Sequence, residues 1–177
     1  MRRLGRALGV EAMSLYNHVE SKDALLDGII EVVLDEVASE PGADWKESLR
    51  GLARSFREIS GRHPRVVRVF ANRTLAGPAW RRSVEDTLAA LLEGGFGEAE
   101  AVNAYRIFWG YLSGYVFAEL RLESAPELDQ YLAQLPADEF PTMHALGPQL
   151  ASTDRESEYE LGVELLLDAF EAKFRRR

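Results

Sequence analysis

The chain has 177 residues, of which 21 are Lys or Arg and 29 are Asp or Glu, so its formal net charge is −8. Hydrophobic residues make up 46% and charged residues 28%, as in an ordinary globular protein. The absence of cysteine excludes disulfides, thiolate metal sites and cysteine nucleophiles. The longest uncharged apolar stretch, residues 107–118, is shorter than the roughly 20 residues of a membrane span. No signal-peptide core follows Met1, so we expect a cytoplasmic protein with no membrane contact.

The charge is distributed unevenly along the chain. Residues 1–22 hold four basic and two acidic side chains, a balance of +2 that leaves −10 for the rest. An acidic protein as a whole is a poor candidate for nucleic-acid binding, but its N-terminal end is mildly basic. A second Arg-rich stretch, between residues 50 and 68, has helical spacing, and a solvated helix face is the expected explanation.

The N-terminal half of the sequence predicts helices only. Apolar positions recur at intervals of three and four residues, and no sustained alternation of period two indicates a strand. Helix-start residues, glycines and prolines predict where each helix begins and ends. In chain order we expect a helix over 2–8 ended by Gly9, a second over about 11–18, a third from Ser21 to about 39, a fourth over 45–61 capped by Asp44, and a short fifth starting at Pro64.

The C-terminal half predicts three more helices and completes an all-α fold. They cover residues 77 to about 92, 98–122 and 154–174, whereas 124–153 is expected to be loop with room for one short helix. The helix over 98–122 is apolar nearly all round, so it must be buried on all faces by its own domain or by a second subunit. The last helix has apolar groups on two faces, one with Tyr159, Val163, Leu166, Phe170 and Phe174, the other with Leu161, Leu165 and Ala169.

Searches for catalytic motifs return little. Ser113 lies in Gly-Tyr-Leu-Ser-Gly, which lacks the spacing and the preceding strand of a nucleophile elbow. Gly95-Phe-Gly97 is too short for a dinucleotide fingerprint. The three histidines are far apart in the sequence, and none forms a metal-ligating pair. We therefore expect a protein that is not an enzyme and that needs no metal or cofactor.

The first residues have the layout of a helix-turn-helix. A short helix, a glycine turn and a second short helix follow one another, with Leu4, Leu8, Val10, Leu15 and Val19 as the apolar contacts between them. The second helix of such a motif enters the DNA major groove. A plain helical hairpin in a bundle fits the pattern equally well, so the pattern alone leaves both interpretations open.

One motif favours DNA binding. Residues 8–27 contain Leu-Gly-Val-Glu-x-x-Ser-Leu-Tyr-x-His-Val-x-Ser-Lys-x-Ala-Leu-Leu-Asp, which closely resembles the DNA-binding module of TetR-family transcriptional repressors. The resemblance continues along the whole chain, to the regulatory domain of the tetracycline-repressor-like members, through His63-Pro64, Gly77-Pro78, Gly94-Gly95-Phe96, Phe140-Pro141 and Tyr159-Glu-Leu-Gly-Val. It implies a DNA-binding module with its connecting helix in residues 1–39 and an effector-binding and dimerisation domain in residues 40–177.

The resemblance also implies roles for individual residues of the DNA-binding module. Ser14, Tyr16 and Lys22 would hold phosphates. Ala12, Met13 and Asn17 occupy positions that face bases in the family. Of these, Ala12 and Met13 can offer only apolar contact, whereas Asn17 could bond an adenine edge. His18 is a family hallmark that either contacts DNA or packs within the module.

Two departures from the family pattern carry expectations of their own. The family's module has three helices and this sequence starts at the second, so we expect roughly twenty residues of amphipathic helix to be encoded upstream. Without that helix, the module would expose apolar surface and bind DNA poorly. In the tetracycline site, Phe70 replaces a magnesium-binding histidine, Leu52 an asparagine and Ala38 a second histidine, while Phe56 is retained. Magnesium–tetracycline is therefore not the expected effector.

The resemblance implies an effector cavity and a dimer. Residues expected to line the cavity are mostly aromatic: Phe56, Phe70, Trp80, Thr87, Tyr105, Trp109 and Tyr115. Such a lining suits a small apolar or aromatic effector, although an ordinary core has the same composition. Helices 98–122 and 154–174 would form a homodimer, which predicts a palindromic double-stranded DNA operator.

The expected function is therefore a ligand-responsive transcriptional repressor. Its effector would act through the connecting helix 22–39, which sets the spacing of the two DNA-reading modules. The alternative is a dimeric helical ligand-binding protein that has lost DNA binding through N-terminal truncation.

Overall fold

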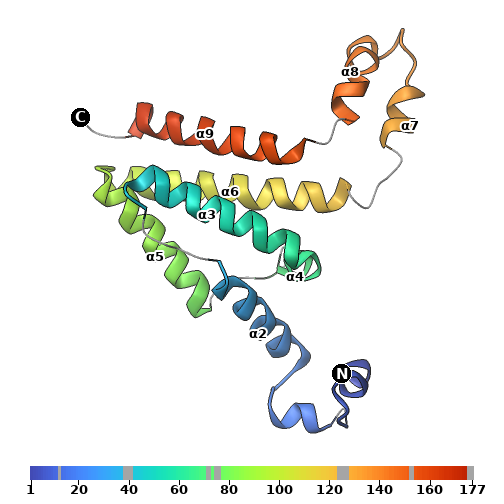
Figure 1. The fold of residues 1–177 in the computed structure, drawn as a ribbon, viewed down its shortest axis with the longest axis vertical. Coiled ribbons are helices and arrows are strands. Elements are labelled where there is room, and N and C mark those ends of the chain that lie inside the picture. The colour runs from blue at the N-terminus through green and yellow to red at the C-terminus, as the bar shows by residue number, and fades with distance from the viewer. Residues whose placement is uncertain are drawn as a thin grey trace. The chain divides into compact units, whose positions relative to one another are not determined.

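The computed structural model describes residues 1–11, 13–37, 42–70, 73, 77–122, 128–151 and 154–174. Every regular element in these ranges is a helix (Figure 1), which confirms the all-α prediction. The chain forms two compact units, Met1–Gly95 and Phe96–Arg177. The first contains α1 (Arg2–Leu8), the 3-10 helix η1 (Ser14–Asn17), α2 (Lys22–Asp35), α3 (Trp45–Arg62), α4 (Pro64–Phe70) and α5 (Pro78–Glu93). The second contains α6 (Glu98–Leu122), α7 (Leu128–Ala133), α8 (Pro141–Ala151) and α9 (Arg155–Phe174).

The chain begins with α1, which ends as predicted at Gly9. That glycine has a φ of 68°, in the left-handed region that closes a helix end. The predicted second helix over 11–18 was wrong in length and type, because among the described residues of this range only Ser14–Asn17 are helical, and they form a 3-10 turn. None of its residues is buried, so no packing energy offsets the cost of nucleating a full α-helix there.

Helix α2 begins where the sequence predicts. The Ser21 hydroxyl accepts a hydrogen bond from the Ala24 N–H at 3.0 Å, which caps the first turn. The helix ends at Asp35, earlier than the predicted end near residue 39. The Val37 N–H donates to the Leu34 carbonyl at 3.0 Å in a tighter turn, and Glu36 pairs with Arg62 at 2.8 Å. Residues 38–41 lie outside the described part of the chain.

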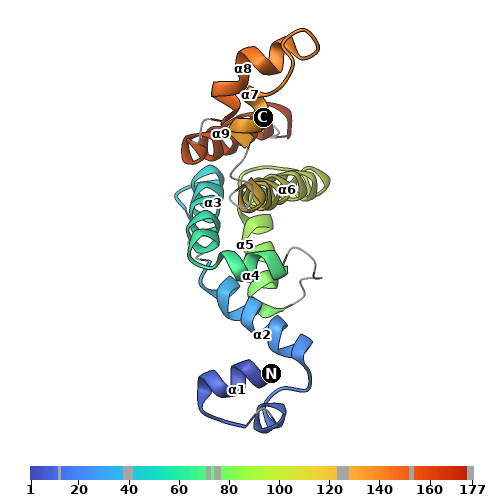
Figure 2. The ribbon, with the colours of Figure 1, turned by 90° about the vertical axis from the view of Figure 1, so that its right-hand side faces the viewer.

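In the first unit, α2 packs against α4 and α5, and α3 packs against the same two helices (Figure 2). Asp44 caps α3 as predicted, because its carboxylate accepts from the Glu47 N–H at 2.9 Å. Helix α5 has Gly77 at its N-cap and no capping side chain of its own. The Glu31 carboxylate of α2 accepts from the Ala79 N–H instead, so one helix satisfies the N-terminus of another.

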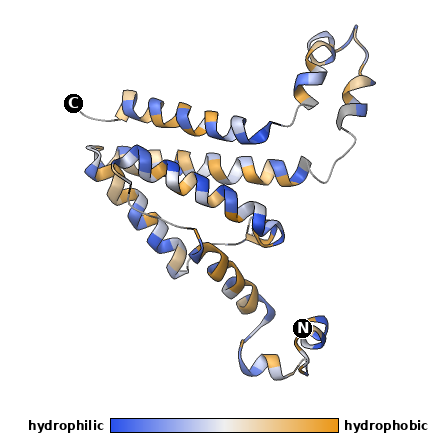
Figure 3. Cartoon of the chain, viewed as in Figure 1, coloured by the Kyte–Doolittle hydropathy of each residue, from blue (hydrophilic) through white to orange (hydrophobic). Residues whose placement is uncertain are grey.

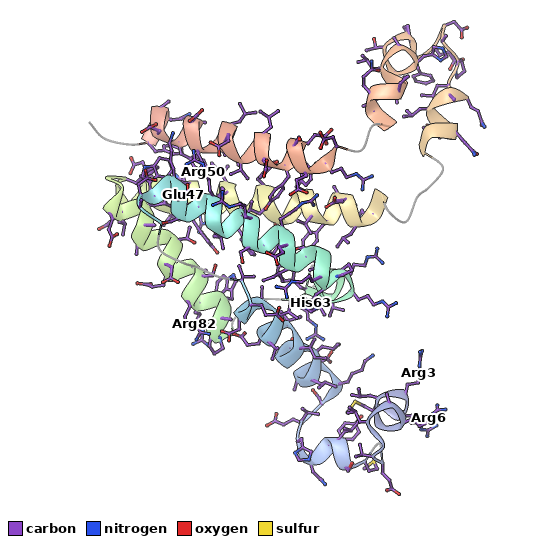
Figure 4. The ribbon with its side chains drawn as sticks, in the orientation of Figure 1. Arg3, Arg6, Glu47, Arg50, His63 and Arg82 are labelled. Atoms are coloured by element: carbon purple, nitrogen blue, oxygen red, sulfur yellow. The ribbon has the colours of Figure 1, made fainter. Side chains whose placement is uncertain are left out.

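The Arg-rich stretch is a solvated and ion-paired helix face. In α3, Arg50 and Arg54 pair with Glu47 at 3.5 and 2.7 Å, and Figure 4 shows Glu47 and Arg50 on the same side of the helix. Arg62 pairs with Glu58 at 3.7 Å. These contacts agree with the expectation from the sequence, and exposed pairs of this kind contribute only a few tenths of a kcal/mol each, roughly.

In the second unit, α6 and α9 lie side by side and antiparallel (Figure 1). Tyr111 and Tyr115 of α6 and Tyr159 of α9 form an aromatic cluster with ring centroids 5.4 to 5.9 Å apart. The hydroxyls of Tyr111 and Tyr115 donate to the Tyr159 and Arg155 carbonyls, both at 2.9 Å. Of the two apolar faces expected on α9, the one with Tyr159, Val163 and Phe170 is buried, together with Leu167, whereas Leu166 is half-buried.

The segment expected to be loop holds two helices, α7 and α8, so that prediction was wrong. They pack against each other: Leu132 is buried, and a Cβ on Gly147 would lie 3.8 Å from the Leu132 Cβ. Pro141 opens α8, where a fixed φ suits the first turn, and Pro148 lies inside it. The loop was expected because residues 124–153 hold four of the seven prolines, but the contact between α7 and α8 stabilises helices there despite the hydrogen bond that Pro148 cannot donate.

Hydrophilic and hydrophobic residues alternate along α3, α5 and α9 (Figure 3). Of the helices in the described ranges, none combines the length and the apolar character needed to cross a membrane.

Candidate effector pocket and DNA-reading head

A partly open apolar pocket lies among α2, α3 and α4, with an empty volume of about 260 Å³ that includes some open solvent. It is lined by Ile30, Val33 and Leu34 from α2, Val37 just beyond it, Phe56, Ile59 and Ser60 from α3, and Val66, Val67 and Phe70 from α4. The spacing of these residues follows the helical repeat, which turns one apolar face of each helix toward the same space.

The two aromatic walls of the pocket are Phe56 and Phe70. Their rings meet edge to face, with centroids 6.3 Å apart and an interplanar angle of 73°, an arrangement that the ring quadrupoles favour. Both residues were predicted to contact the effector, and the structure brings them together. Phe70 has no atom that could ligate magnesium, in line with the expected loss of the metal–tetracycline site.

Among the described residues that line the pocket, Ser60 is the one with a polar side chain. Its hydroxyl donates to the Phe56 carbonyl at 2.6 Å, so its proton is already used and its oxygen can still accept a hydrogen bond. No charged side chain lines the pocket, and burying an ion there without a partner would be costly. The pocket therefore suits a neutral, apolar molecule with at most one donor group facing Ser60.

The other residues predicted to bind the effector do not line this pocket. Thr87 is buried in α5, where its hydroxyl donates to the Ser83 carbonyl at 2.6 Å, and Trp80 lies half-buried near the start of the same helix. Tyr105, Trp109 and Tyr115 belong to α6 in the second unit. Burial raises the pKa of Tyr105 above its usual value, and Tyr115 is held by its bond to α9.

Sequence reasoning missed the aliphatic part of the pocket. It favoured aromatic residues, whereas six of the ten lining residues are Ile or Val, among them Ile30, Val33 and Val67. The periodic apolar face of the connecting helix could have indicated them, because a helix between two modules buries that face against one of them. Of the residues compared with the tetracycline site, Leu52 is buried in the core and Ala38 lies outside the described residues.

The DNA-reading head, defined as residues 1–22, presents its basic and polar side chains to solvent. Arg3 and Arg6 project from α1 (Figure 4), and Lys22 is exposed at the start of α2. The predicted base- and phosphate-facing residues Met13, Tyr16, Asn17 and His18 are all exposed. Ser14 is half-buried, and its hydroxyl donates to the Glu11 carbonyl at 2.7 Å. Ala12 lies outside the described residues.

Helix α2 belongs to both sites. It begins at Lys22, at the end of the reading head, and its later turns form one wall of the pocket. One helix thus runs from the end of the reading head to the wall of the pocket.

Comparison with known proteins identifies the family. Residues 38–174 match the family model described as "Tetracyclin repressor-like, C-terminal domain". The chain belongs to the TetR family. The class A tetracycline repressor protein from transposon 1721 of Escherichia coli is 31% identical to it over 172 residues, which cover 94% of this chain and 78% of that repressor.

Two further relatives extend the assignment. An HTH-type transcriptional regulator of Saccharopolyspora erythraea is 35% identical over 121 residues, 67% of this chain but only 51% of that regulator. The crystal structure of the TetR family protein ActR of Streptomyces coelicolor in complex with actinorhodin has a TM-score of 0.80 and 29% identity, covering 97% of this chain and 86% of that one. This TetR-family member is therefore a transcriptional regulator and not an enzyme, which confirms the resemblance inferred from residues 8–27.

Proposed function

We propose that this TetR-family regulator is a repressor that binds a palindromic operator as a homodimer and is released by a small apolar or aromatic effector. The observation that carries the proposal is the double role of α2, which begins at the reading head and lines the pocket. Residues 1–39 would form the DNA-binding part and residues 40–177 the effector-binding and dimerisation part. The site of action is the cytoplasm, where the operator lies.

The pocket volume supports an effector that moves α2. Sites for drug-sized ligands usually measure roughly 300 to 1,000 Å³, whereas this pocket in its present arrangement has free room of only about 10 Å³, about that of one water molecule. A molecule of two or more fused rings enters only if α2 shifts relative to α3 and α4. The effector then favours the shifted arrangement, and its preference for that arrangement is the free energy available to release DNA.

Dimerisation is supported by apolar side chains that the chain leaves exposed on α6 and α9. They are Val102, Ile107, Leu161 and Leu165, and the last two are 60% and 62% exposed. Two leucines this exposed on one helix are typical of a surface that a second subunit covers. A symmetric dimer would present two reading heads to two half-sites one helical turn of DNA apart.

Operator binding can be tested with Lys22→Ala. We expect wild-type protein to bind a duplex that it selects from a random palindromic library, with an affinity that falls steeply as salt rises. In Lys22→Ala, each subunit of the dimer loses one phosphate contact. The negative slope of log K against log[salt] should therefore become shallower by about 2, as measured by fluorescence anisotropy. The control is Lys173→Ala, which removes the same charge from an exposed position in the last turn of α9.

Equal slopes in Lys22→Ala and Lys173→Ala would contradict the assigned role of Lys22. A wild-type protein that selects no duplex but still dimerises and binds ligand would instead support the alternative function, a helical ligand-binding protein without DNA binding.

The pocket can be tested with N-phenylnaphthylamine, a neutral aromatic fluorophore that brightens in apolar sites. Val66 and Val69 are both half-buried on α4, but only Val66 lines the pocket. We expect Val66→Phe to weaken probe binding at least about tenfold, because the added ring occupies much of a cavity of this size. Val69→Phe, which adds the same ring to the same helix, should leave the affinity nearly unchanged in a fluorescence titration. Equal weakening by both variants would place the probe elsewhere.

A further inference from the structure

An acidic stripe runs along α2. It consists of Asp23, Asp27, Glu31 and Asp35, which recur at every fourth position and so lie on one face of the helix. Each of the four carboxylates has a partner outside α2. Asp23 and Asp27 pair with Arg73, Glu31 accepts from the Ala79 N–H, and Asp35 pairs with Arg82. The stripe therefore contacts Arg73, Ala79 and Arg82 in turn along the length of the helix.

The two arginines on the stripe differ in their surroundings. Arg82 and Asp35 are both more than 60% exposed, so water and salt screen their attraction. The Arg73 side chain is only 20% exposed and reaches two carboxylates, Asp23 and Asp27, which are themselves 79% and 62% exposed. Its Nη2 donates to Asp23 Oδ1 at 2.5 Å and its Nη1 donates to Asp27. A guanidinium that joins two carboxylates is the stronger and more directional of the two contacts.

Arg73 is also joined to the wall of the pocket through its backbone. Its N–H donates to the Phe70 carbonyl at 3.0 Å, and the Phe70 ring lines the pocket against Phe56. The same residue thus contacts the pocket wall with its main chain and the first two turns of α2 with its side chain. Those turns start at Lys22, next to the reading head.

We propose that Arg73 is the positioning residue that couples effector occupancy to the DNA-reading head, an inference that rests on the proposed function. Apolar contacts in the pocket hold the later turns of α2. The ion pairs of Arg73 with Asp23 and Asp27, called the Arg73 clamp below, hold its first turns. When the effector displaces α4 or the pocket face of α2, the clamp makes the first turns move with Phe70. Without the clamp, the pocket still fills, but the reading head no longer follows.

The test compares Arg73→Met with Arg82→Met in the full chain. Both variants remove one arginine from the same acidic stripe, but only Arg73 is bonded to a pocket residue. For each protein, N-phenylnaphthylamine affinity is measured by fluorescence, and affinity for the selected duplex is measured with and without saturating probe. In wild type we expect the probe to weaken duplex binding by about 5- to 150-fold, the usual range of allosteric coupling.

We expect Arg73→Met to bind the probe as wild type does, within about twofold, while the effect of the probe on duplex binding falls below about threefold. Arg82→Met should retain the wild-type fold-change, and Arg73→Lys, which keeps the charge but loses the fork, should fall between them. If the probe weakens duplex binding by Arg73→Met as much as it does in wild type, the inference is overturned and the proposed function is left intact. A wild-type protein whose duplex binding ignores the probe overturns both.

A second measurement separates coupling from a purely structural role. Amide hydrogen exchange of residues 22–27 should change on probe binding in wild type and in Arg82→Met, but not in Arg73→Met. If Arg73 only stabilised the fold, Arg73→Met would lower the melting temperature and leave the probe-induced change in exchange unaltered, which would overturn the proposal.

Discussion

The double substitution of Leu161 and Leu165 by Glu should convert the protein to a monomer and weaken operator binding at least about 100-fold. Both leucines are on α9, and both are largely exposed in the single chain. Facing carboxylates at a two-fold interface would be buried without partners, so association becomes unfavourable. The loss of DNA affinity follows because two linked reading heads bind two half-sites with an effective concentration that a monomer lacks.

The measurement is analytical ultracentrifugation, followed by anisotropy titration of the selected duplex. Leu92→Glu is the matched control, since Leu92 is also exposed but belongs to α5 in the first unit. It should remain dimeric and bind DNA as wild type does. A dimer that survives both glutamates would show that α9 is not the interface, and a Leu92→Glu monomer would contradict the assignment equally.

Gly162→Ala should lower the free energy of unfolding by about 1–3 kcal/mol, the usual cost of forcing extra volume into a packed site. Gly162 is on α9, and a Cβ at this position would overlap the hydroxyl and ring of Tyr111 on α6. Tyr111 can move away only by giving up its bond to the Tyr159 carbonyl and its stacking on the Tyr159 ring. The glycine is therefore required by the close approach of the two helices.

Gly51→Ala is the control, and we expect it to change the free energy of unfolding in the opposite direction. Gly51 is inside α3, where an added Cβ meets no atom within 4 Å. Alanine there should stabilise the protein by about 0.5–1 kcal/mol, because glycine loses more backbone entropy in a helix. Urea denaturation measures both variants. If Gly162→Ala also stabilised the protein, the packing of Tyr111 against α9 described above would be wrong.

Local signals explain why most helix boundaries were predictable. Ser21 and Asp44 cap helices through bonds to residues three positions later, and Gly9 ends α1 through its own backbone conformation. Such signals depend only on near neighbours in the chain, so the sequence contains them fully. The expected helix over 11–18 failed for the converse reason, since its length depends on burial that the reading head does not provide.

The pocket was only half predictable. Phe56 and Phe70 were predicted because both occupy positions of the family's effector site, Phe56 as a retained residue and Phe70 in place of a histidine, and their rings do meet in space. Ser60 and the α2 residues were missed. The periodic apolar face of α2 indicates that these residues are buried, but it does not separate a pocket wall from an ordinary core. Tyr115 shows the reverse case, an aromatic residue expected in the pocket whose hydroxyl is bonded to α9.

The sequence by itself determined the all-α fold, the main helices and the family, because helical periodicity, caps and the motif in residues 8–27 are all short-range patterns. The tertiary structure alone decided which faces meet. It placed Glu31 at the N-terminus of α5 and Arg73 between the pocket wall and the first turns of α2. The contacts of α2 with Ala79 and Arg73 join residues 48 and 50 positions apart in the chain. They form only once the packing of α2 against α4 and α5 has brought these residues together.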